Sequence, residues 1–384
     1  MAHPSWGGTF QYNLAMLHAV AALPRDDFEP VIACTNGHWF EHIRQSGLPA
    51  TYVAPNFWGG VLNRVWRESG LPVAWWRRLS LRVHSIPRML VKLKCDLWIF
   101  PSQEPWTYLA PVPALAAIHD LMHRYEGHFP EVGSKKIYRE REKHYMGVRN
   151  WAAGILVDSA VGKEHVQESY EVSLDRIHVL PFVTPRYMFD SRSAADFGAR
   201  YMLPPRFIFY PAQFWEHKNH NRLVKAAASL RDEMPDLQLV FVGSRKNGYE
   251  ATQRLVHDLG LSNRVHFLGY VPNEDMPELY RRAHALIMPT FFGPTNIPPL
   301  EAMAVGCPVA VSGNYAMPEQ LGDAALYFDP LSVEEIAHAI QRLWEDNALC
   351  DELSRRGRLR SNQWTQAHFN ERLQVIINRI LGQM

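Results

Sequence analysis

Short apolar runs alternate with helical stretches along nearly the whole chain of 384 residues. This rhythm is typical of βαβ units, which build parallel sheets. Strands are expected at residues 30–34, 50–53, 97–100, 115–118, 154–158, 176–180, 207–211, 237–242, 265–268, 285–288, 308–311 and 325–328. Helices are expected at residues 10–23, 135–151, 163–170, 219–229, 250–259, 275–283, 298–305 and 333–344, and over the end at 349–381.

Prolines interrupt this rhythm once, between residues 181 and 205, as in a linker. The chain also exceeds the length at which one hydrophobic core usually stops growing. We therefore predict an α/β fold of two Rossmann-like, doubly wound domains that face each other across a cleft, where ligands bind at the carboxyl ends of the strands. The predicted parts are an N-terminal domain at 1–182, a linker at 183–205, a C-terminal domain at 206–362 and a C-terminal helix at 363–384 that crosses back to the N-terminal domain.

The start of the chain lacks the apolar strand with which an α/β domain usually opens. Residues 1–6 are few and polar, and the sequence passes almost directly to Gly7 and Gly8 and then to the helical pattern. We interpret this as a missing first strand. The alternative is a first sheet whose edge is built differently.

Composition excludes several classes of protein. The formal net charge is +1, so no overall field draws the chain to nucleic acid. The four cysteines are far apart, without the spacing of metal ligands, and are expected to be free thiols. The chain has no apolar run of membrane-spanning length and no signal-peptide pattern. These features predict a cytoplasmic protein.

The segment 291–308, FFGPTNIPPLEAMAVGCP, carries the strongest functional signal. It follows a strand, enters a helix at residues 298–299 and leaves that helix at Gly306, in agreement with the boundary preferences of proline and glycine. Free N–H groups at the helix start, near residues 295–297, would form an anion site suited to a diphosphate. The carboxylate of Glu301, one turn inside, would accept hydrogen bonds from ribose hydroxyls. The alternative is a capped core helix in which Glu301 only favours the helix dipole.

This segment resembles the donor-binding loop and helix of retaining glycosyltransferases of family 4, which have the two-domain GT-B fold. The resemblance extends through most of the second half and more weakly through the first. It implies that Glu301 binds the ribose and that Thr295, Asn296 and Ile297 meet the diphosphate and the sugar. The family usually places another Glu eight positions earlier, against the transferred sugar, and that position is Gly293 here. Thr295 or Asn296 would then hold the sugar without a negative charge.

A second segment, 210–220, lies between the first strand of the second half and its helix. In the family this loop brings an Arg and then a Lys to the donor diphosphate. Lys218 matches the Lys, whereas Gln213 stands at the Arg position, so His217 or Arg222 would have to replace it. A fixed cation stabilises the negative charge of a leaving diphosphate. For Lys218 alone, a solvated basic helix start is the alternative.

A third segment, 116–123, ends a buried strand in His119 and Asp120. Polar residues at the carboxyl end of a parallel strand face the ligand crevice. The resemblance places His119 beside the donor sugar, with Asp120 orienting His119 or binding an acceptor hydroxyl. The stretch 123–131 resembles the mobile acceptor loop of part of the family. The alternative is a structural histidine.

Weaker signals lie at other turns. Gly8 belongs to a glycine pair that resembles the family's N-terminal loop, where backbone approaches the phosphate and the acceptor. Ser244 and Tyr270 follow two strands at which the family holds the nucleobase with backbone groups. A general likeness to mannosyltransferase-type members favours GDP-mannose over UDP-sugars. Asp-x-Asp metal pairs do not occur in the sequence, so neither a metal nor a cofactor is expected.

The region 75–94 is aromatic and basic, as in an amphipathic helix that docks on an anionic membrane. Its aromatic and charged residues are Trp75, Trp76, Arg77, Arg78, Arg82, Arg88, Lys92 and Lys94. The alternative is a surface helix whose arginines face water. Docking would place the protein at the inner face of the membrane.

Together these signals predict a retaining hexosyltransferase that moves a sugar from a nucleotide-sugar donor to a glycan or lipid-linked acceptor, in cell-surface polysaccharide synthesis. The catalytic candidates are His119, Asp120 and Lys218. The resemblance implies same-face attack, with the leaving phosphate taking the acceptor proton. Two alternatives stay open. One is a nucleotide-sugar epimerase. The other is an inactive nucleotide-sugar-binding scaffold or sensor, which Gly293 and Gln213 support.

Overall fold

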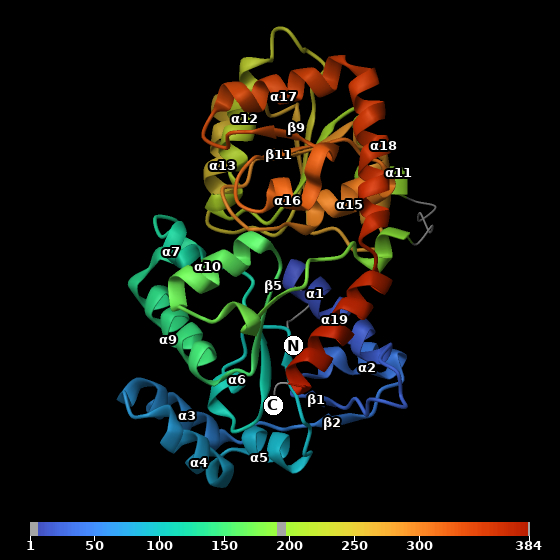
Figure 1. The fold of residues 1–384 in the computed structure, drawn as a ribbon. Helices are drawn as coiled ribbons and strands as arrows, with labels where there is room; N and C mark the ends of the chain where they lie inside the picture. Colours follow the sequence, from blue (N-terminus) through green and yellow to red (C-terminus); the bar gives the residue numbers. More distant parts are fainter. Residues whose placement is uncertain (1–6, 190–196, 383–384) are drawn as a thin grey trace. The chain divides into compact units, whose positions relative to one another are not determined.

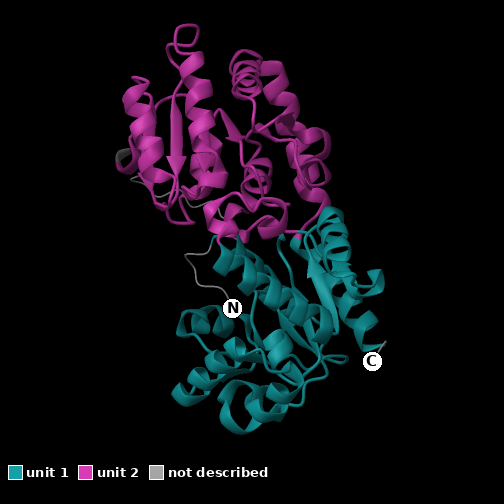
Figure 2. Cartoon of the chain, turned by 90° about the vertical axis from the view of Figure 1, so that its left-hand side faces the viewer, with its two compact units in different colours: residues 1–121, 135–181, 366–384 teal, residues 122–134, 182–365 magenta. Residues whose placement is uncertain are grey.

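The structure, a computed structural model, describes residues 7–189 and 197–382. The chain forms two compact units, coloured separately in Figure 2. The first unit contains Met1–Leu121, Lys135–Pro181 and Gln366–Met384, and the second contains Met122–Ser134 and Phe182–Thr365. Each unit holds parallel β-strands with helices packed against them (Figure 1), which confirms the predicted α/β class with two Rossmann-like domains.

The second unit is built on one continuous parallel sheet, in the order β12-β11-β10-β7-β8-β9. Its strands are β7 (Ile208–Pro211), β8 (Leu239–Val242), β9 (Val265–Gly269), β10 (Ala285–Met288), β11 (Val309–Ser312) and β12 (Leu326–Phe328). The four inner strands are buried along their whole length. Strands covered on both faces need unbroken apolar runs, and this is the pattern that the sequence shows.

Helices surround this sheet in two packed groups, with α12, α13 and α17 in one and α14, α15 and α18 in the other. The helices of the second unit are α7 (Met122–Tyr125), α8 (Pro130–Gly133), α11 (Phe197–Tyr201), α12 (His220–Ser229), α13 (Tyr249–Asp258), α14 (Met276–Arg282), α15 (Ile297–Val305), α16 (Met317–Leu321), α17 (Val333–Glu345) and α18 (Asn347–Gln363). Short 3₁₀ turns are η4 (Arg186–Phe189), η5 (Glu216–Lys218) and η6 (Gly322–Ala324).

The first unit has two separate parallel sheets rather than one. One sheet pairs β1 (Ile32–Cys34) with β2 (Ala50–Tyr52), and the other has the order β3-β4-β5-β6. The strands of the second of these sheets are β3 (Trp98–Phe100), β4 (Ala114–Ala117), β5 (Gly154–Val157) and β6 (Ile177–Val179). Among the described residues no strand joins the two sheets.

The helices of the first unit come from both ends of the chain. They are α1 (Gly8–Ala21), α2 (Phe40–Ser46), α3 (Phe57–Ser69), α4 (Val73–Val83), α5 (Ser85–Lys92), α6 (Trp106–Leu109), α9 (Lys135–Trp151), α10 (Ala160–Tyr170) and α19 (Gln366–Leu381), with the turns η2 (Gly37–Trp39) and η3 (Leu174–Arg176). Helix α19 packs on α1. Tyr12 and Phe369 meet edge to face at 5.9 Å between ring centres, and the Gln366 amide donates to the Ala15 carbonyl at 3.0 Å.

Every strand expected from the sequence is present within two residues of its predicted bounds, and the long helices agree within three. The region 75–94 is an exception, because two helices replace the single amphipathic helix expected there. The chain is extended at His84, between α4 and α5, with φ −122° and ψ 131°. Trp76 and Leu90 are buried, whereas Trp75 is 60% exposed.

Candidate functional site

The loop after β10 and the start of α15 have the boundaries that the sequence predicts. Asn296 is the extended residue before the helix, prolines lie in the first turn, and Gly306 ends the helix in the left-handed conformation with φ 80°. Gly293 has φ 109°, and a Cβ there would lie 2.9 Å from the Asn296 side chain. A glutamate would be strained at this position. Glycine therefore suits the backbone conformation at position 293.

Lys218 is held against this loop by its neighbours. Its N–H donates to the Trp215 carbonyl at 3.0 Å, and its own carbonyl accepts from the Tyr210 hydroxyl at 2.8 Å. The next residue, Asn219, has φ 61°, and its side-chain amide donates to the carbonyls of Pro289 at 2.9 Å and Pro330 at 2.8 Å. These bonds tie the Lys218 turn to the strand ends from which the donor loop starts.

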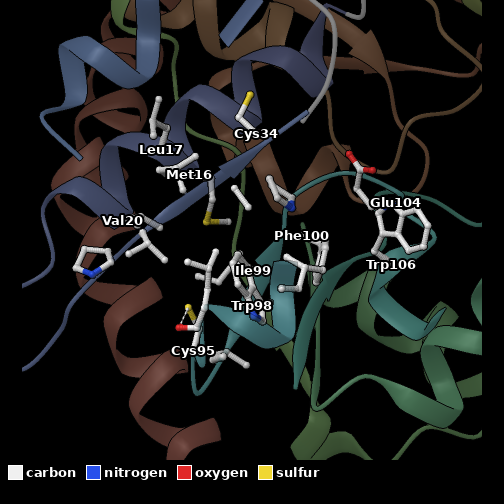
Figure 3. A pocket seen from close by; sticks show the side chains of 18 of the residues that line it. Met16, Leu17, Val20, Cys34, Cys95, Trp98, Ile99, Phe100, Glu104 and Trp106 are labelled. Atoms are coloured by element: carbon white, nitrogen blue, oxygen red, sulfur yellow. Dashed lines mark hydrogen bonds between the residues drawn. The ribbon is translucent and has the colours of Figure 1, made fainter. Parts of the chain in front are cut away.

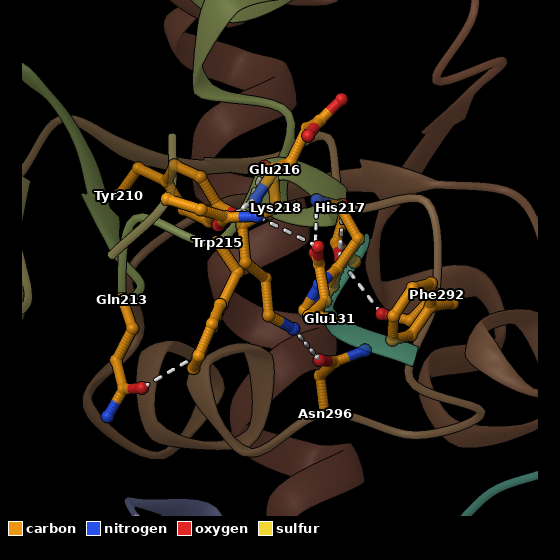
Figure 4. Close-up of polar contacts among 11 residues, drawn as sticks. Glu131, Tyr210, Gln213, Trp215, Glu216, His217, Lys218, Phe292 and Asn296 are labelled. Carbon is orange, nitrogen blue, oxygen red and sulfur yellow. Dashed lines mark hydrogen bonds and ion pairs between the residues drawn. The ribbon is translucent and has the colours of Figure 1, made fainter. Parts of the chain in front are cut away.

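The structure brings Lys218 and Asn296 together, as Figure 4 shows. Lys218 Nζ donates to Asn296 Oδ1 at 3.2 Å, and Asn296 Nδ2 donates to the Gly293 carbonyl at 3.0 Å. A cation thus lies at the N-terminal end of α15, where the helix dipole also favours an anion.

Part of the expected ring of free N–H groups at residues 295–297 is absent. The Asn296 N–H donates to Gln320 Oε1 at 3.0 Å, and the Asn296 carbonyl accepts from Gln320 Nε2 at 2.8 Å. Pro298 and Pro299 carry no N–H. The prediction was therefore wrong for the Asn296 amide, and Gln320 gave no sequence signal because it lies in a separate helix, α16, further along the chain. Thr295 and Ile297 are buried at this turn.

Glu301 is buried and hydrogen-bonded to two tyrosines. Tyr187 donates to its Oε1, and Tyr280 donates to its Oε2 at 2.5 Å. Burial raises the pKa of Glu301, while the two tyrosine bonds act in the opposite direction. A carboxylate has about four acceptor positions, so two tyrosines leave it acceptor capacity for ribose hydroxyls. Neither tyrosine was identified from the sequence, because η4 and α14 are distant from this helix along the chain.

Glu131 and His217 form a second polar group beside the Lys218 turn (Figure 4). The Glu131 carboxylate is bonded to the His217 ring, to the His217 N–H at 2.9 Å and to the Asn247 amide at 3.0 Å. Burial opposes ionisation of Glu131, but the bonds from His217 outweigh it and lower the pKa to about 2. The His217 ring stacks on Phe292 with centres 3.8 Å apart.

His217 and Arg222 were the candidates to replace the missing Arg of the diphosphate site. His217 instead contacts Glu131 and Phe292. The guanidinium of Arg222 lies over the Phe291 ring at 5.0 Å and donates to Asn219 Oδ1 at 3.3 Å. The ring contacts of His217 with Phe292 and of Arg222 with Phe291 hold the loop after β10 next to the Lys218 turn. His217 and Arg222 therefore support Lys218 indirectly.

Gln213, Ser244 and Tyr270 follow the neighbouring strands β7, β8 and β9 at the same edge of the sheet. Gln213 Oε1 accepts from the Trp215 indole at 3.0 Å, and the Ser244 carbonyl accepts from the Phe214 N–H at 3.1 Å. Tyr270 is 74% exposed. The donor-binding candidates of the second unit therefore lie along one edge, at the carboxyl ends of β10, β7, β8 and β9.

In the first unit, His119 follows β4 and is half-buried. Its Nε2 lies 2.9 Å from the Pro101 carbonyl, and its ring meets Tyr12 of α1 edge to face at 5.0 Å. Burial lowers the pKa of His119, so the ring is neutral at neutral pH. Gly8 is the first residue of α1, after Gly7 with φ 53°.

Asp120, the residue after His119, is bonded to Arg141 and Tyr145 of α9. Its carboxylate pairs with Arg141, and its carbonyl accepts from Arg141 and from the Tyr145 hydroxyl, each at 3.0 Å. The Arg141 side chain is 14% exposed and that of Asp120 is 28% exposed. The ion pair between the Asp120 carboxylate and Arg141 thus joins the end of β4 to α9. The His119 ring is bonded to the Pro101 carbonyl.

Metal ligands do not gather in the described part of the chain, where no group of three or more His, Cys, Asp or Glu residues could hold an ion. The four cysteines are free thiols. No helix within residues 7–189 and 197–382 is both long and apolar enough to cross a membrane.

Part of the second unit matches a known protein family. Residues 200–360 match the family described as glycosyl transferases group 1. The chain is 44% identical over 84 residues to O-antigen chain mannosyltransferase B of Escherichia coli, which is 22% of each protein. It is 29% identical over 226 residues to an O-antigen chain mannosyltransferase of Salmonella typhimurium, which is 59% of each protein. The matched parts thus span about a fifth to three fifths of these relatives.

Two solved structures share the fold over nearly the whole chain. HepE of Anabaena, in complex with UDP and glucose, superposes with a TM-score of 0.72 at 16% identity and covers 96% of this chain and 95% of its own. A glycosyltransferase from Rickettsia africae has a TM-score of 0.72 at 17% identity and covers 98% and 96%. The chain therefore has the GT-B fold, and the match to the group 1 family covers residues 200–360.

Proposed function

We propose that this protein is a glycosyltransferase that transfers a hexose from a nucleoside-diphosphate sugar to a glycan or lipid-linked acceptor. The observation that carries the proposal is the bond between Lys218 and Asn296 at the start of α15, with Glu301 one turn further along that helix. A fixed cation, a helix N-terminus and a buried carboxylate match the diphosphate and ribose of one ligand. The group 1 family match over the same residues supports this assignment.

Each group would act on a different part of the donor. The Lys218 ammonium would neutralise the charge that develops on the leaving diphosphate. Glu301 would accept hydrogen bonds from the ribose, beside Tyr187 and Tyr280. The transferred sugar would meet Thr295 and Asn296, and neutral His119 would serve as a hydrogen-bonding group. The loop brings no carboxylate to the sugar, because Gly293 replaces it.

Retention of configuration is the expected stereochemical outcome. The leaving phosphate would take the acceptor proton on the same face of the sugar, so no side chain has to serve as general base. GDP-mannose is the donor that we favour, and the O-antigen mannosyltransferases among the relatives support it, as does a role in cell-surface polysaccharide synthesis. Proton NMR of the first product formed from an α-linked donor tests retention: an α-linked product is expected, and a β-linked one would refute it.

An inactive nucleotide-sugar sensor is the second candidate, favoured by Gly293 and by Gln213 at the Arg position. Calorimetric titration with GDP-mannose and UDP-glucose, followed by measurement of donor hydrolysis and transfer, separates the two functions. The enzyme is expected to bind one donor and release its nucleoside diphosphate slowly to water. Binding with no release, in water or with any acceptor extract, would favour the sensor.

Exposed aromatic side chains on α3 and α4 support contact with an anionic membrane. The two helices pack together, Phe57, Trp58 and Trp75 are each at least 60% exposed, and Arg78 and Arg82 of α4 are also exposed. Exposed aromatic and basic groups suit an interface of acidic lipids. We therefore propose α3 and α4, rather than the whole region 75–94, as the contact.

Flotation with liposomes tests this contact. The protein is expected to float with liposomes that contain anionic lipid and to lose this on replacing Trp58 and Trp75 with serine. Replacement of Leu359, which is 53% exposed in the second unit, is the control. No flotation of the unmodified protein would end the membrane proposal and leave the transferase proposal untouched.

A further inference from the structure

Glu131 is a charged residue whose side chain is only 6% exposed. A carboxylate enclosed by apolar groups is costly and takes up a proton. Groups of that kind line the cavity of about 440 Å³ in the first unit, where Met16, Leu17 and Ile99 are among the lining residues (Figure 3). Burial raises the pKa of Glu131 too, but the hydrogen bonds from His217 outweigh burial and lower it to about 2. Glu131 is therefore ionised at neutral pH and depends on its donors.

The donors to this carboxylate come from two loops of the second unit (Figure 4). Its Oε1 is bonded to the His217 ring and accepts from the His217 backbone N–H at 2.9 Å. Its Oε2 accepts from Asn247 Nδ2 at 3.0 Å. Asn247 Oδ1 in turn accepts from the Glu216 backbone N–H at 3.1 Å. Glu131 and Asn247 together therefore take up the first two N–H groups of η5, the Lys218 turn.

The Lys218 turn has no local substitute for these two bonds. The residue before it, Trp215, is extended with φ −74° and ψ 148°, and its side chain makes no bond to the turn. The third N–H, that of Lys218, donates to the Trp215 carbonyl at 3.0 Å. The first N–H groups of a helical turn need acceptors from outside the turn. The orientation of the turn, and with it the path of the Lys218 side chain, thus depends on residues 131 and 247.

Glu131 is itself held in place, because the segment Met122–Ser134 belongs to the second unit. In this segment Phe129 packs against Phe291 and Phe292, with ring centres 5.2 Å and 5.6 Å away. The two phenylalanines lie in the loop after β10, which leads to the start of α15. The segment therefore contacts both sides of the donor site, the turn that carries the lysine and the loop to which the lysine is bonded.

We propose that Glu131 is a positioning residue for the donor diphosphate and that it acts through Lys218. Together with Asn247, it fixes the Lys218 turn so that the ammonium lies against Asn296 at the start of α15. This inference rests on the donor site proposed above. It adds to that site a residue that has the same sign of charge as the ligand and nevertheless favours binding of the ligand.

The sign of the effect distinguishes this role from charge alone. Where only charge matters, removal of a carboxylate near an anion site strengthens binding of the anion. Glu131→Gln should instead weaken binding of GDP or UDP about fivefold, because one end of the new amide is a donor that faces another donor. Calorimetric titration with whichever of the two nucleotides the wild type binds measures the affinity. Glu216→Gln removes an exposed carboxylate from the same turn, and this matched control should not weaken binding.

A second substitution restores the network. When Glu131→Gln is combined with Asn247→Asp, the new amide donates to the new carboxylate, which still accepts from the Glu216 N–H. The charge of the pair is unchanged, and the affinity should return to within roughly twofold of wild type. In a Lys218→Ala background, Glu131→Gln should change the affinity by less than roughly twofold, because its effect passes through the lysine. A general loss of stability would weaken binding in both backgrounds.

Asn247→Ala, at an exposed position, opens the same network outside the core and should weaken binding about threefold. Unchanged or tighter binding in both Glu131→Gln and Asn247→Ala would overturn the proposal. So would an equal loss in the Lys218→Ala background, or no recovery when Asn247→Asp is added. A Lys218→Ala protein that binds the nucleotide as the wild type does would refute the donor site itself, and the proposal with it.

Discussion

The two units differ in how their described strands are arranged. In the second unit, four neighbouring strands of a continuous six-stranded sheet present the donor-binding candidates along one edge. In the first unit, the described strands form two separate sheets, and His119 and Asp120 follow β4 of the four-stranded one. The contrast suggests that substitutions in the second unit act mainly on chemistry, and that substitutions in the first act mainly on folding.

The largest expected effect is that of Lys218→Ala. Removing the cation should lower kcat/KM for transfer by about 10²–10³-fold, because the charge on the leaving diphosphate loses its stabilising partner. The melting temperature should change little, since the Lys218 side chain is bonded to Asn296 at the surface of a complete sheet. Lys225→Ala, at an exposed position on α12, is the control. Equal kinetics for the two variants would break the contrast.

Glu301→Gln should have the next largest effect. The amide keeps the shape of the side chain but loses one acceptor and the charge, so KM for the donor should rise roughly tenfold. Glu301→Ala is a poorer test, because it would leave the hydroxyls of Tyr187 and Tyr280 without their acceptor. Tyr280→Phe separates the two roles: it should change stability more than KM. A rise in KM for Tyr280→Phe equal to that for Glu301→Gln would contradict a distinct ribose role for Glu301.

Asp120→Asn tests the first unit, where we expect substitutions to act mainly on folding. Loss of its ion pair with the nearly buried Arg141 should lower the free energy of unfolding by about 1–3 kcal/mol. Urea denaturation measures this change, and kcat of the folded fraction should fall less than tenfold. A variant of unchanged stability and greatly reduced kcat would show instead that Asp120 is a catalytic carboxylate.

The smallest expected effect is a dependence of stability on acidic pH. The pKa of Glu131 is lowered from 4.5 to about 2 in the folded protein. Its contribution is therefore complete above the unfolded value near 4.5 and is lost as the pH falls towards 2. Melting curves between pH 6 and pH 3 should converge for wild type and Glu131→Gln as the pH falls. Exposed Glu216→Gln should follow the wild type throughout, and parallel curves for Glu131→Gln would count against the ion pair.

The sequence predicted the elements better than it predicted the side-chain partners. Unbroken apolar runs such as that of β8 identify buried parallel strands, because only strands covered on both faces need them. Proline and glycine likewise located α15, since their backbone preferences are local.

Contacts between distant segments could not be predicted in this way. Tyr187 and Tyr280 meet at Glu301 from different elements, and Gln320 of α16 accepts the hydrogen bond of the Asn296 N–H. Arg141 binds Asp120 across 21 residues of chain. The φ of 109° at Gly293 could not be predicted either, and it shows that a glutamate there would be strained.

Calorimetric titration of the wild type and of Lys218→Ala with GDP-mannose, UDP-glucose and the free nucleoside diphosphates tests the central claim most directly. The account predicts that the wild type binds one of these donors and its diphosphate without added metal. It predicts that Lys218→Ala binds both at least tenfold more weakly while Lys225→Ala binds them normally. Binding that is unchanged in Lys218→Ala, or no binding of any nucleoside diphosphate by a well-folded wild type, would contradict the donor site proposed at Lys218, Asn296 and Glu301.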